Sequence, residues 1–397
     1  MKKKIFFDFA INIISNLVLI AIIQLLILPI LSRDVTTKVF GEIVSIYGFS
    51  NVITTFLGNT LNNIRLITSD KEKPDFFSLS FITNIVSFLL IFILSFIYGR
   101  NLSVANIIIF SISTMLTNNR IYSSVFYRKQ LKFIGLLYMN LSVVAGYLLG
   151  MFLLNQIGGS YWSLIFLIGE VIGHVYLFLS NNEIVYEFKT ADLRKLDHRI
   201  TKKFINLSFA NLIANVLNYL DRFMILPILG AVSMSTFYAA SSISKIIAML
   251  VTPMTNVLLS YIAKDDYKIK RKKLLLITTY LFVAFIPMYF IVNYVSVFLI
   301  NILYPSLANQ SLPLVPIITI GILFNVIGNI INTFLLKLYK LFYQNVIQVS
   351  YGIIYIILAV FMSINNGIIG FSIAYVIAMI IKLLLQMTII AFCKQEV

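Results

Sequence analysis

Histidine, cysteine and tryptophan are scarce in this sequence, which has two, one and one of them in 397 residues. The single Cys393 excludes an intrachain disulfide framework and provides no thiolate cluster for a metal. His174 and His198 do not have the spacing of paired metal ligands, so we expect no metal site and no bound cofactor. The sequence also lacks a G-x-x-x-x-G-K-[ST] phosphate loop and a G-x-S-x-G nucleophile motif. We therefore expect a protein that is not an enzyme.

Acidic residues are half as frequent as basic ones, 15 against 31, and the formal net charge is +16. A charge of this sign is compatible with nucleic-acid binding. However, no basic block is interleaved with aromatic residues as in a nucleic-acid module. The distribution of the basic residues fits membrane topology better, so we expect no nucleic-acid partner.

Long apolar runs fill the chain, which is 60% hydrophobic with a mean hydropathy of +0.95. A soluble domain has about 45–50% apolar residues, and a helix of about 20 apolar residues spans a bilayer. The first run extends to Leu31, which is too long for a cleaved signal peptide, so we expect it to remain as a span. The sequence predicts an all-α membrane protein with twelve transmembrane helices, at 5–31, 39–66, 76–98, 103–127, 133–155, 160–180, 204–229, 233–262, 274–300, 312–336, 341–363 and 367–392.

The positions of lysine and arginine predict the orientation of these spans. If the N-terminus, the C-terminus and every loop after an even-numbered span face the cytoplasm, that side holds 25 of the 31 basic residues. The opposite side holds three, and Arg222, Lys245 and Lys382 fall inside spans. Cytoplasmic loops are enriched in basic residues, so we predict that both termini are cytoplasmic.

Short segments recur in the two halves of the chain. The sequence ILPIL ends both the first and the seventh predicted span, at residues 27–31 and 225–229. A Phe-x-x-Lys-x-x-Lys pattern follows both span four and span ten, beginning at Phe126 and Phe334. We interpret these matches as an internal duplication of six helices.

Residues 181–203 form the longest polar stretch and divide the predicted spans six and six. We therefore predict an N-terminal six-helix lobe at 1–180, a basic cytoplasmic linker at 181–203 and a C-terminal lobe at 204–397. Two lobes of six helices have the same orientation in the membrane, which is a parallel internal repeat. Transporters built in this way have their substrate site near the midplane, between the repeats.

Polar residues repeat with helical spacing within the apolar spans. In span seven, Asn211, Asn215, Asn218 and Arg222 are four, three and four residues apart, which places them on one face of a helix. A charge in the middle of a membrane helix costs about 2.5–3.5 kcal/mol, so it persists against protein or water. We therefore expect this face to line a polar cavity.

Similar faces occur in span two and span eight, the neighbours of spans one and seven. Together with span seven they define the predicted cavity residues: Arg65, Arg222, Lys245, Asn62, Asn211, Asn215, Asn218 and Asn256. For a single asparagine, a hydrogen bond between packed helices is an alternative to a ligand contact. A stripe that includes an arginine or a lysine favours the cavity, because helix packing alone does not need a cation.

Three residues in the spans are candidates for coupling to H⁺ or Na⁺. Glu170 and His174 lie four residues apart in span six, where their side chains can meet, and Asp221 lies beside Arg222 in span seven. A fixed structural hydrogen bond is the alternative for the Glu170–His174 pair. Lys382 lies toward the cytoplasmic end of the last span, where we expect its long side chain to reach the membrane surface.

Twelve spans, a central basic loop and the sequence NYLDRFMI at residues 218–225 resemble one branch of a known superfamily. So do Leu229-Gly230 and the segment FYAA at residues 237–240. The superfamily is that of the multidrug/oligosaccharidyl-lipid/polysaccharide exporters, and the branch is that of the O-antigen and capsule repeat-unit flippases. The resemblance implies two lobes around a central cationic cavity that alternates between the two sides of the membrane.

The resemblance also implies a function. The substrate would be an oligosaccharide repeat unit on undecaprenyl pyrophosphate, moved from the inner to the outer leaflet of a bacterial plasma (inner) membrane for lipopolysaccharide or capsule assembly. Implied partners are the lipid-linked oligosaccharide, membrane lipids, and the polysaccharide polymerase with its chain-length machinery. One alternative is a multidrug or metabolite antiporter of the same superfamily. A glycan polymerase or acyltransferase is a weaker alternative, because such enzymes have a large outer loop or a membrane His/Asp motif.

Overall fold

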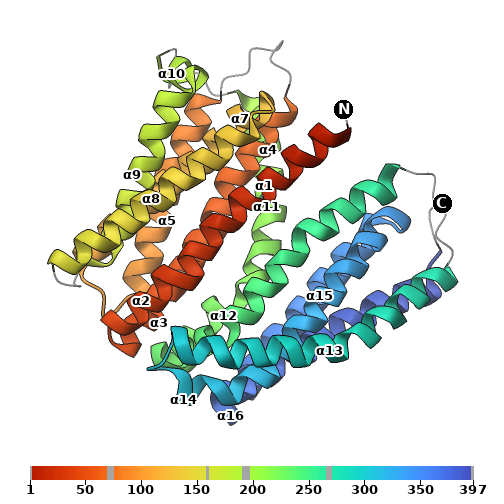
Figure 1. The fold of residues 1–397 in the computed structure, drawn as a ribbon. Helices are drawn as coiled ribbons and strands as arrows, with labels where there is room; N and C mark the ends of the chain where they lie inside the picture. Colours follow the sequence, from red (N-terminus) through yellow and green to blue (C-terminus); the bar gives the residue numbers. More distant parts are fainter. Residues whose placement is uncertain (1, 69–75, 158–160, 190–196, 265–270, 395–397) are drawn as a thin grey trace. The chain divides into compact units, whose positions relative to one another are not determined.

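The computed structural model of the chain describes residues 2–68, 76–157, 161–189, 197–264 and 271–394, which are helical and contain no strand (Figure 1). The elements of the first half are α1 Lys2–Ile22, η1 Ile23–Ile27, α2 Leu28–Asp34, α3 Thr37–Thr54, η2 Thr55–Asn59, α4 Thr60–Ile67, α5 Phe77–Tyr98, α6 Val104–Ser123, α7 Val125–Lys129, α8 Phe133–Ile157 and α9 Ser163–Ser180. Those that follow are α10 Asn182–Lys189, α11 His198–Asn218, α12 Leu220–Lys264, α13 Arg271–Leu303, α14 Ala308–Ser311, η5 Leu312–Leu314, α15 Val315–Leu338 and α16 Leu341–Phe392.

Nine helical segments among the described residues are long and apolar enough to cross a membrane. The chain is therefore a multi-pass membrane protein, and the predicted all-α class is confirmed. Two predicted spans, α6 and α11, are not among the nine, since asparagine and basic residues reduce their hydropathy. The number of twelve spans and the cytoplasmic location of the termini stay predictions.

Two of the longest helices are interrupted by a glycine. Gly230 in α12 has φ 84° and ψ 173°, and Gly367 in α16 has φ 59° and ψ −140°. Both backbone conformations are accessible to glycine and strained for residues with a Cβ. Gly230 lies in the turn predicted between spans seven and eight, and Gly367 is the first residue of the predicted span twelve. Each long helix therefore consists of two helical segments.

The chain divides into two compact units, Met1–Phe223 and Met224–Val397. The sequence places the start of the C-terminal lobe at residue 204, about twenty residues earlier. The difference arises because α11 packs against α3, η2 and α4, and it is therefore part of the first unit. The assignment of six spans to each lobe stays a prediction.

Three helices of the first unit begin at residues with short polar side chains. The Thr36 side chain accepts a hydrogen bond from the Val39 amide at the start of α3, and Ser103 accepts one from Asn106 at the start of α6. Asp197 accepts from two amides at the start of α11. Such caps satisfy amide groups that have no partner within the helix. They fix where α3, α6 and α11 begin, and thus which residues face one another.

Small residues bring α8 and α9 close together in the first unit. A Cβ on Gly146 of α8 would lie 2.6 Å from the Cα of Gly169 on α9. Glycine allows this approach because it has no side chain, as at other close contacts between membrane helices. The helix α8 also packs against α1, and α9 packs against α6. The contact at Gly169 therefore places the next residue, Glu170, between α6 and α8.

Candidate functional site

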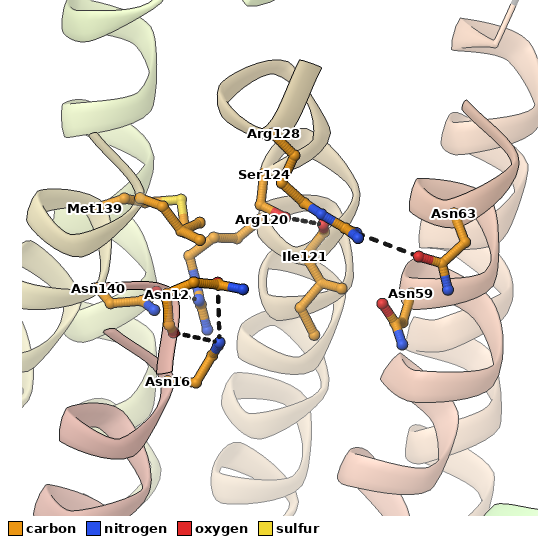
Figure 2. A pocket seen from close by; sticks show the side chains of 11 residues that line it. Asn12, Asn16, Asn59, Asn63, Arg120, Ile121, Ser124, Arg128, Met139 and Asn140 are labelled. Carbon is orange, nitrogen blue, oxygen red and sulfur yellow. Dashed lines mark hydrogen bonds between the residues drawn. The ribbon is translucent and has the colours of Figure 1, made fainter. Parts of the chain in front are cut away.

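A polar pocket of about 350 Å³ lies within the first unit (Figure 2). Its walls come from α1, the η2–α4 segment, the end of α6, α7 and the start of α8. Most of its lining residues are asparagine or arginine, and they are Asn12, Asn16, Asn59, Asn63, Arg120, Ile121, Ser124, Arg128, Leu136, Met139 and Asn140. Such a lining donates and accepts hydrogen bonds and has positive charge, which suits an anionic or hydroxyl-rich ligand.

The asparagine residues of the pocket face each other from two sides in Figure 2. On α1, Asn12 and Asn16 are one turn apart, and the Asn16 amide nitrogen donates to the Asn12 backbone oxygen at 2.9 Å. Across the pocket, Asn59 ends the π-helical turn η2 and Asn63 follows in α4. A π-helical turn adds a residue to the helix, and it often occurs at functional sites. Here it joins the buried helix α3 to the pocket-lining residues of α4.

A buried ion pair fixes one arginine of the pocket. The guanidinium of Arg120 on α6 binds the carboxylate of Glu170 on α9 through Nε–Oε2 at 2.7 Å and Nη2–Oε1 at 2.9 Å. The remaining Nη1 donates to Asn140 Oδ1 at 3.2 Å, and Asn140 in turn donates to Ser15 Oγ at 2.8 Å. These bonds connect α1, α6, α8 and α9. The two-point geometry holds the guanidinium plane in one orientation at the edge of the pocket.

The second arginine of the pocket, Arg128 on α7, has neutral partners. Its Nη1 donates to the side-chain oxygen of Asn62 and, at 3.2 Å, to that of Asn63. No described carboxylate forms a salt bridge with it. Burial lowers the pKa of Arg128 from its usual value, yet an arginine remains charged at physiological pH. Arg128 therefore gives the pocket a positive charge that Glu170 does not neutralise.

Asn62, a predicted cavity residue, holds α4 against the end of α6. Its amide nitrogen donates to the backbone oxygens of Ile121 at 2.7 Å and Tyr122 at 3.2 Å, and to Ser124 Oγ at 2.9 Å. The residue is 1% exposed. Asn62 does not line the pocket itself, but it positions Arg128, which does.

The other predicted residues of the first unit have separate surroundings. Arg65 on α4 lies over two aromatic rings, with its Cζ 4.8 Å from the Phe76 centroid and 5.8 Å from that of Phe126. Arg222, in the first turn of α12, is 5% exposed, and its Nε lies 3.7 Å from the Asp221 carboxylate. Neither Arg65 nor Arg222 lines the pocket.

The predicted asparagine stripe of α11 partly faces the first unit. Asn211 donates to Thr60 Oγ1 of α4 at 2.7 Å, which joins the two helices. Asn215 donates to the Asn211 backbone oxygen at 2.7 Å, and Asn218 is exposed at the end of α11. The structure thus brings Asn211 to the helix that contains Asn62 and Arg65. A common cavity for all the predicted residues stays a prediction.

Two predicted cavity residues belong to the second unit. The Nζ of Lys245 on α12 lies 5.8 Å from the centre of the Phe237 ring, about two turns earlier in the same helix. The side chain of Asn256 lies outside the described residues. Their role in substrate binding stays a prediction.

The predicted ion-coupling residues Glu170 and His174 are close, but their side chains have different partners. The Glu170 carboxylate binds Arg120 and accepts from Tyr147 Oη at 3.3 Å. The His174 ring contacts the backbone oxygen of Glu170 through Nδ1 at 2.7 Å, and Asn119 through Nε2 at 3.3 Å. The contact between the His174 ring and the Glu170 backbone oxygen is a local structural hydrogen bond of the kind that was the alternative to ion coupling for this pair. Ion coupling through Glu170, His174 or Asp221 stays a prediction.

Sequence reasoning missed most of the pocket. Asn12 and Asn16 have helical spacing in the sequence, but Arg120 and Arg128 are among the 25 basic residues that the predicted topology places on the cytoplasmic side. The sequence contains one signal for the pair of Arg120 and Glu170. The polar run Thr117–Arg120 lies within predicted span four, and the acidic residue Glu170 lies within predicted span six. A charge within a span predicts a partner of opposite charge. This rule connects Arg120 with Glu170.

Comparison with solved structures defines the class of the fold. The chain superimposes on a lipid II flippase MurJ in an inward closed conformation with a TM-score of 0.70 and 18% identity, over 98% of this chain and 86% of that one. A multidrug resistance MATE family transporter of the MOP superfamily gives 0.65 and 11% over 96% and 98%, and a eukaryotic MATE transporter gives 0.63 and 12% over 99% and 96%. At these identities the likeness establishes the fold alone. The chain has the fold of MurJ and MATE transporters.

The family follows from the sequence comparison. The family described as polysaccharide biosynthesis protein matches residues 30–313, which is more than half of the chain, and the chain belongs to it. The predicted family resemblance is thereby confirmed. None of the curated proteins matches the sequence.

Proposed function

We propose that the protein is a flippase for lipid-linked oligosaccharides. It moves undecaprenyl-pyrophosphate-linked repeat units from the inner to the outer leaflet, where they are used to assemble O-antigen, capsule or a related surface polysaccharide. Membership of the polysaccharide biosynthesis family and the MurJ/MATE-type fold support a transporter of this kind. The observation that carries the proposal is the asparagine- and arginine-lined pocket in the first unit.

The chemistry of the pocket suits the head group of such a substrate. Arginine forms two-point hydrogen bonds with phosphate oxygens, and Arg128 is held in place by the neutral amides of Asn62 and Asn63. The asparagine side chains donate to and accept from sugar hydroxyls. A volume of about 350 Å³ is at the small end of ligand pockets. We therefore assign to it part of the head group, while the polyprenyl chain stays in lipid.

The predicted topology places the pocket at the side where the substrate is made. Asn12 follows the N-terminus, Asn63 and Arg120 precede the ends of spans two and four, and Asn140 follows the start of span five. All four positions are at the predicted cytoplasmic ends of their spans. We propose that the head group enters this pocket from the cytoplasm and that movement of the two lobes exposes it on the outside. In this proposal the predicted residues Arg222 and Lys245 line the central cavity through which the head group moves.

We propose that ion coupling or the membrane potential drives export. With a negative cytoplasm, two negative charges that move outward through 100 mV gain about 4.6 kcal/mol, since one charge gains about 2.3 kcal/mol. Coupling to H⁺ or Na⁺ would involve Glu170, His174 or Asp221. Membrane lipids, a polysaccharide polymerase and its chain-length machinery are the proposed partners, in a bacterial plasma membrane.

A multidrug or metabolite antiporter is the second candidate, because the chain also has the fold of MATE transporters. The positive charge of Arg128 disfavours cationic drugs in the pocket of the first unit. Efflux of cationic dyes that depends on this protein, without an effect on surface glycan, would select the antiporter.

The test uses Arg128→Gln, with Lys132→Gln as its control. Lys132 is exposed, lies four residues away and does not line the pocket. In cells that lack the gene, we expect undecaprenyl-linked repeat units to accumulate on the cytoplasmic side, as measured by lipid extraction. The control variant should restore surface glycan, and Arg128→Gln should reach the membrane without restoring it. Normal glycan with Arg128→Gln would remove the pocket from the proposal.

A further inference from the structure

The second unit contains a buried lysine with uncharged partners. Lys382 on α16 is 5% exposed, and its Nζ donates to Asn325 Oδ1 at 2.9 Å and to Asn329 Oδ1 at 3.1 Å, both on α15. The same Nζ lies 5.3 Å from the centre of the Tyr351 ring. The sequence leads us to expect that Lys382 reaches the membrane surface, and this expectation is wrong. The side chain of Lys382, on the second segment of α16, instead contacts α15 and the first segment of α16.

None of the described residues of the second unit has a carboxylate with which to pair Lys382. Between residues 224 and 397 the acidic residues are Asp265, Asp266 and Glu396, and all three lie outside the predicted spans. An ammonium group inside a membrane is costly, and most such groups are stabilised by a carboxylate. In this unit the stabilisation comes from two amide oxygens and the face of an aromatic ring, which are weaker partners than a full negative charge.

We infer that Lys382 is a proton-binding site, which takes up and releases a proton on its ε-amino group. The burial of Lys382 destabilises its charged form, and no carboxylate compensates for this effect. Both protonation states are then accessible. An ammonium in a salt bridge with a carboxylate would instead remain protonated.

Asparagine suits both states of the lysine. In the observed arrangement the oxygens of Asn325 and Asn329 accept from the ammonium. When the lysine loses a proton, its nitrogen gains a lone pair, and an asparagine amide that rotates by 180° presents its NH₂ group to that lone pair. An aspartate at either position has no such second arrangement. The amide pair therefore supports proton release as well as proton binding.

The packing around Lys382 is close. On α16, one turn further, Gln386 donates to the backbone oxygen of Gly328 on α15 at 3.0 Å. A Cβ on Gly328 would lie 3.2 Å from Gln386 Oε1 and 3.8 Å from Lys382 Cε. Gly328 thus lets α16 approach α15 between the two asparagines. This close contact keeps bulk water from the ammonium and makes its hydrogen bonds depend on how α15 and α16 pack.

Other titratable groups near Lys382 are few. Tyr351 is the one that faces it, and Lys337, at the end of α15, is exposed. The helix α13 also packs against α15 and α16. Its ionisable groups are exposed, namely Arg271, Lys272, Lys273, Tyr280 and Tyr294, except Tyr289, whose ring stacks on Phe285. Lys382 is therefore the buried basic group in this part of the unit.

The experiment measures proton binding without any substrate. The full-length protein is reconstituted into proteoliposomes on a solid-supported membrane, and the transient current after a step in pH is recorded. We expect a current from the wild type and from Lys337→Met, the control on α15. Tyr351→Phe should also keep it. We expect loss of the current in Lys382→Met and in Lys382→Arg, because methionine has no proton to exchange and arginine keeps its proton at physiological pH.

Two further variants separate a proton site from a structural contact. Lys382→Arg keeps a cation and hydrogen-bond donors, so a purely structural role predicts that it behaves as the wild type. Asn325→Asp supplies a carboxylate that holds the ammonium in its charged form, and we expect it to abolish the current in a folded protein. A wild-type current in Lys382→Met or Lys382→Arg would overturn the inference. The inference would also be overturned if Glu170→Gln lost the current while Lys382→Met kept it.

This inference does not depend on which molecule is transported. A failure of the pH-step experiment leaves the proposed flippase function unaffected. Conversely, normal surface glycan with Arg128→Gln would contradict the assignment of the first-unit pocket and would not affect the assignment of Lys382.

Discussion

Gly48 on α3 lies directly against the side chain of Arg222. A Cβ at position 48 would be 2.6 Å from Cγ of Arg222, which is closer than a Cβ approaches another carbon atom, and 3.1 Å from Cδ. The absence of a side chain at Gly48 therefore determines where the buried Arg222 lies. Both residues belong to the first unit.

We predict that Gly48→Ala displaces Arg222 and reduces export to the same extent as Arg222→Gln. Overpacking of this kind costs about 1–3 kcal/mol. Surface glycan and the amount of protein in the membrane are the measurements. Because both changes act on the position of one guanidinium, the double variant should lose no more export than either single variant.

The control for this prediction is Ser45→Ala, one turn earlier on the same helix. Ser45 Oγ donates to the Gly41 backbone oxygen within α3, so its removal leaves Arg222 in place. Normal export with Gly48→Ala, alongside a complete loss with Arg222→Gln, would show that the observed position of Arg222 is unimportant for export.

A second prediction concerns Asn62 and its neighbour Asn63. Asn62→Ala removes the hydrogen bonds that the Asn62 amide donates to the oxygens of Ile121 and Tyr122 and releases Arg128. A buried group that loses its partner costs about 1–3 kcal/mol, so we expect a lower melting temperature for the purified protein. Asn63 is exposed and has a single bond to Arg128, so Asn63→Ala should change the melting temperature little.

This comparison also separates two roles of Asn62. If Asn62 positions Arg128, as the hydrogen bonds indicate, stability and export decline together. A variant Asn62→Ala that melts as the wild type but exports nothing would instead favour the sequence-based hypothesis, in which Asn62 contacts the substrate directly.

Much of the helical architecture could be predicted from the sequence, because a bilayer requires helices of a certain length. The predicted turn after residue 229 contains Gly230, where the structure interrupts α12, and the interruption of α16 at Gly367 falls on the first residue of the last predicted span. The π-helical turns η1 and η2 were not predictable in this way, since their hydrogen bonds depend on the packing of neighbouring helices. The membership of α11 in the first unit likewise depends on tertiary contacts.

The pocket was less predictable than the helices. Helical spacing groups residues within one helix, and it correctly groups Asn12 with Asn16. It does not relate Arg120 to Glu170, fifty residues apart on α6 and α9. Arg128 lies at the cytoplasmic end of a predicted span, where basic residues are frequent for reasons of topology, so its role in a pocket had no distinct signal in the sequence.

A third prediction concerns Gly367, which has φ 59° and ψ −140°. A Cβ in this conformation is strained, so we expect Gly367→Ala to lower the free energy of unfolding by about 1–3 kcal/mol. No atom lies within 4 Å of the added Cβ, and the cost is therefore one of backbone conformation and not of collision. Ile364→Ala, at an exposed side chain one turn earlier, is the control. Thermal unfolding in detergent measures both, and equal melting temperatures would contradict the prediction.

The last prediction tests the buried pair of Arg120 and Glu170. Removal of one partner leaves a buried charge uncompensated, so Arg120→Met and Glu170→Leu should each destabilise the protein by about 3–5 kcal/mol. The double variant has no buried charge at this place, and we expect it to be more stable than either single variant. Thermal unfolding of the four proteins gives the interaction energy of the pair.

Export should respond differently from stability in these four proteins. Arg120 lines the pocket, so the double variant should fold and still export poorly, as measured by surface glycan. This separation of stability from export is what a pocket arginine predicts, because a purely structural ion pair regains both when two apolar side chains replace it. Full export by the double variant would show that Arg120 serves the fold alone, and the positive charge of the pocket would then rest on Arg128.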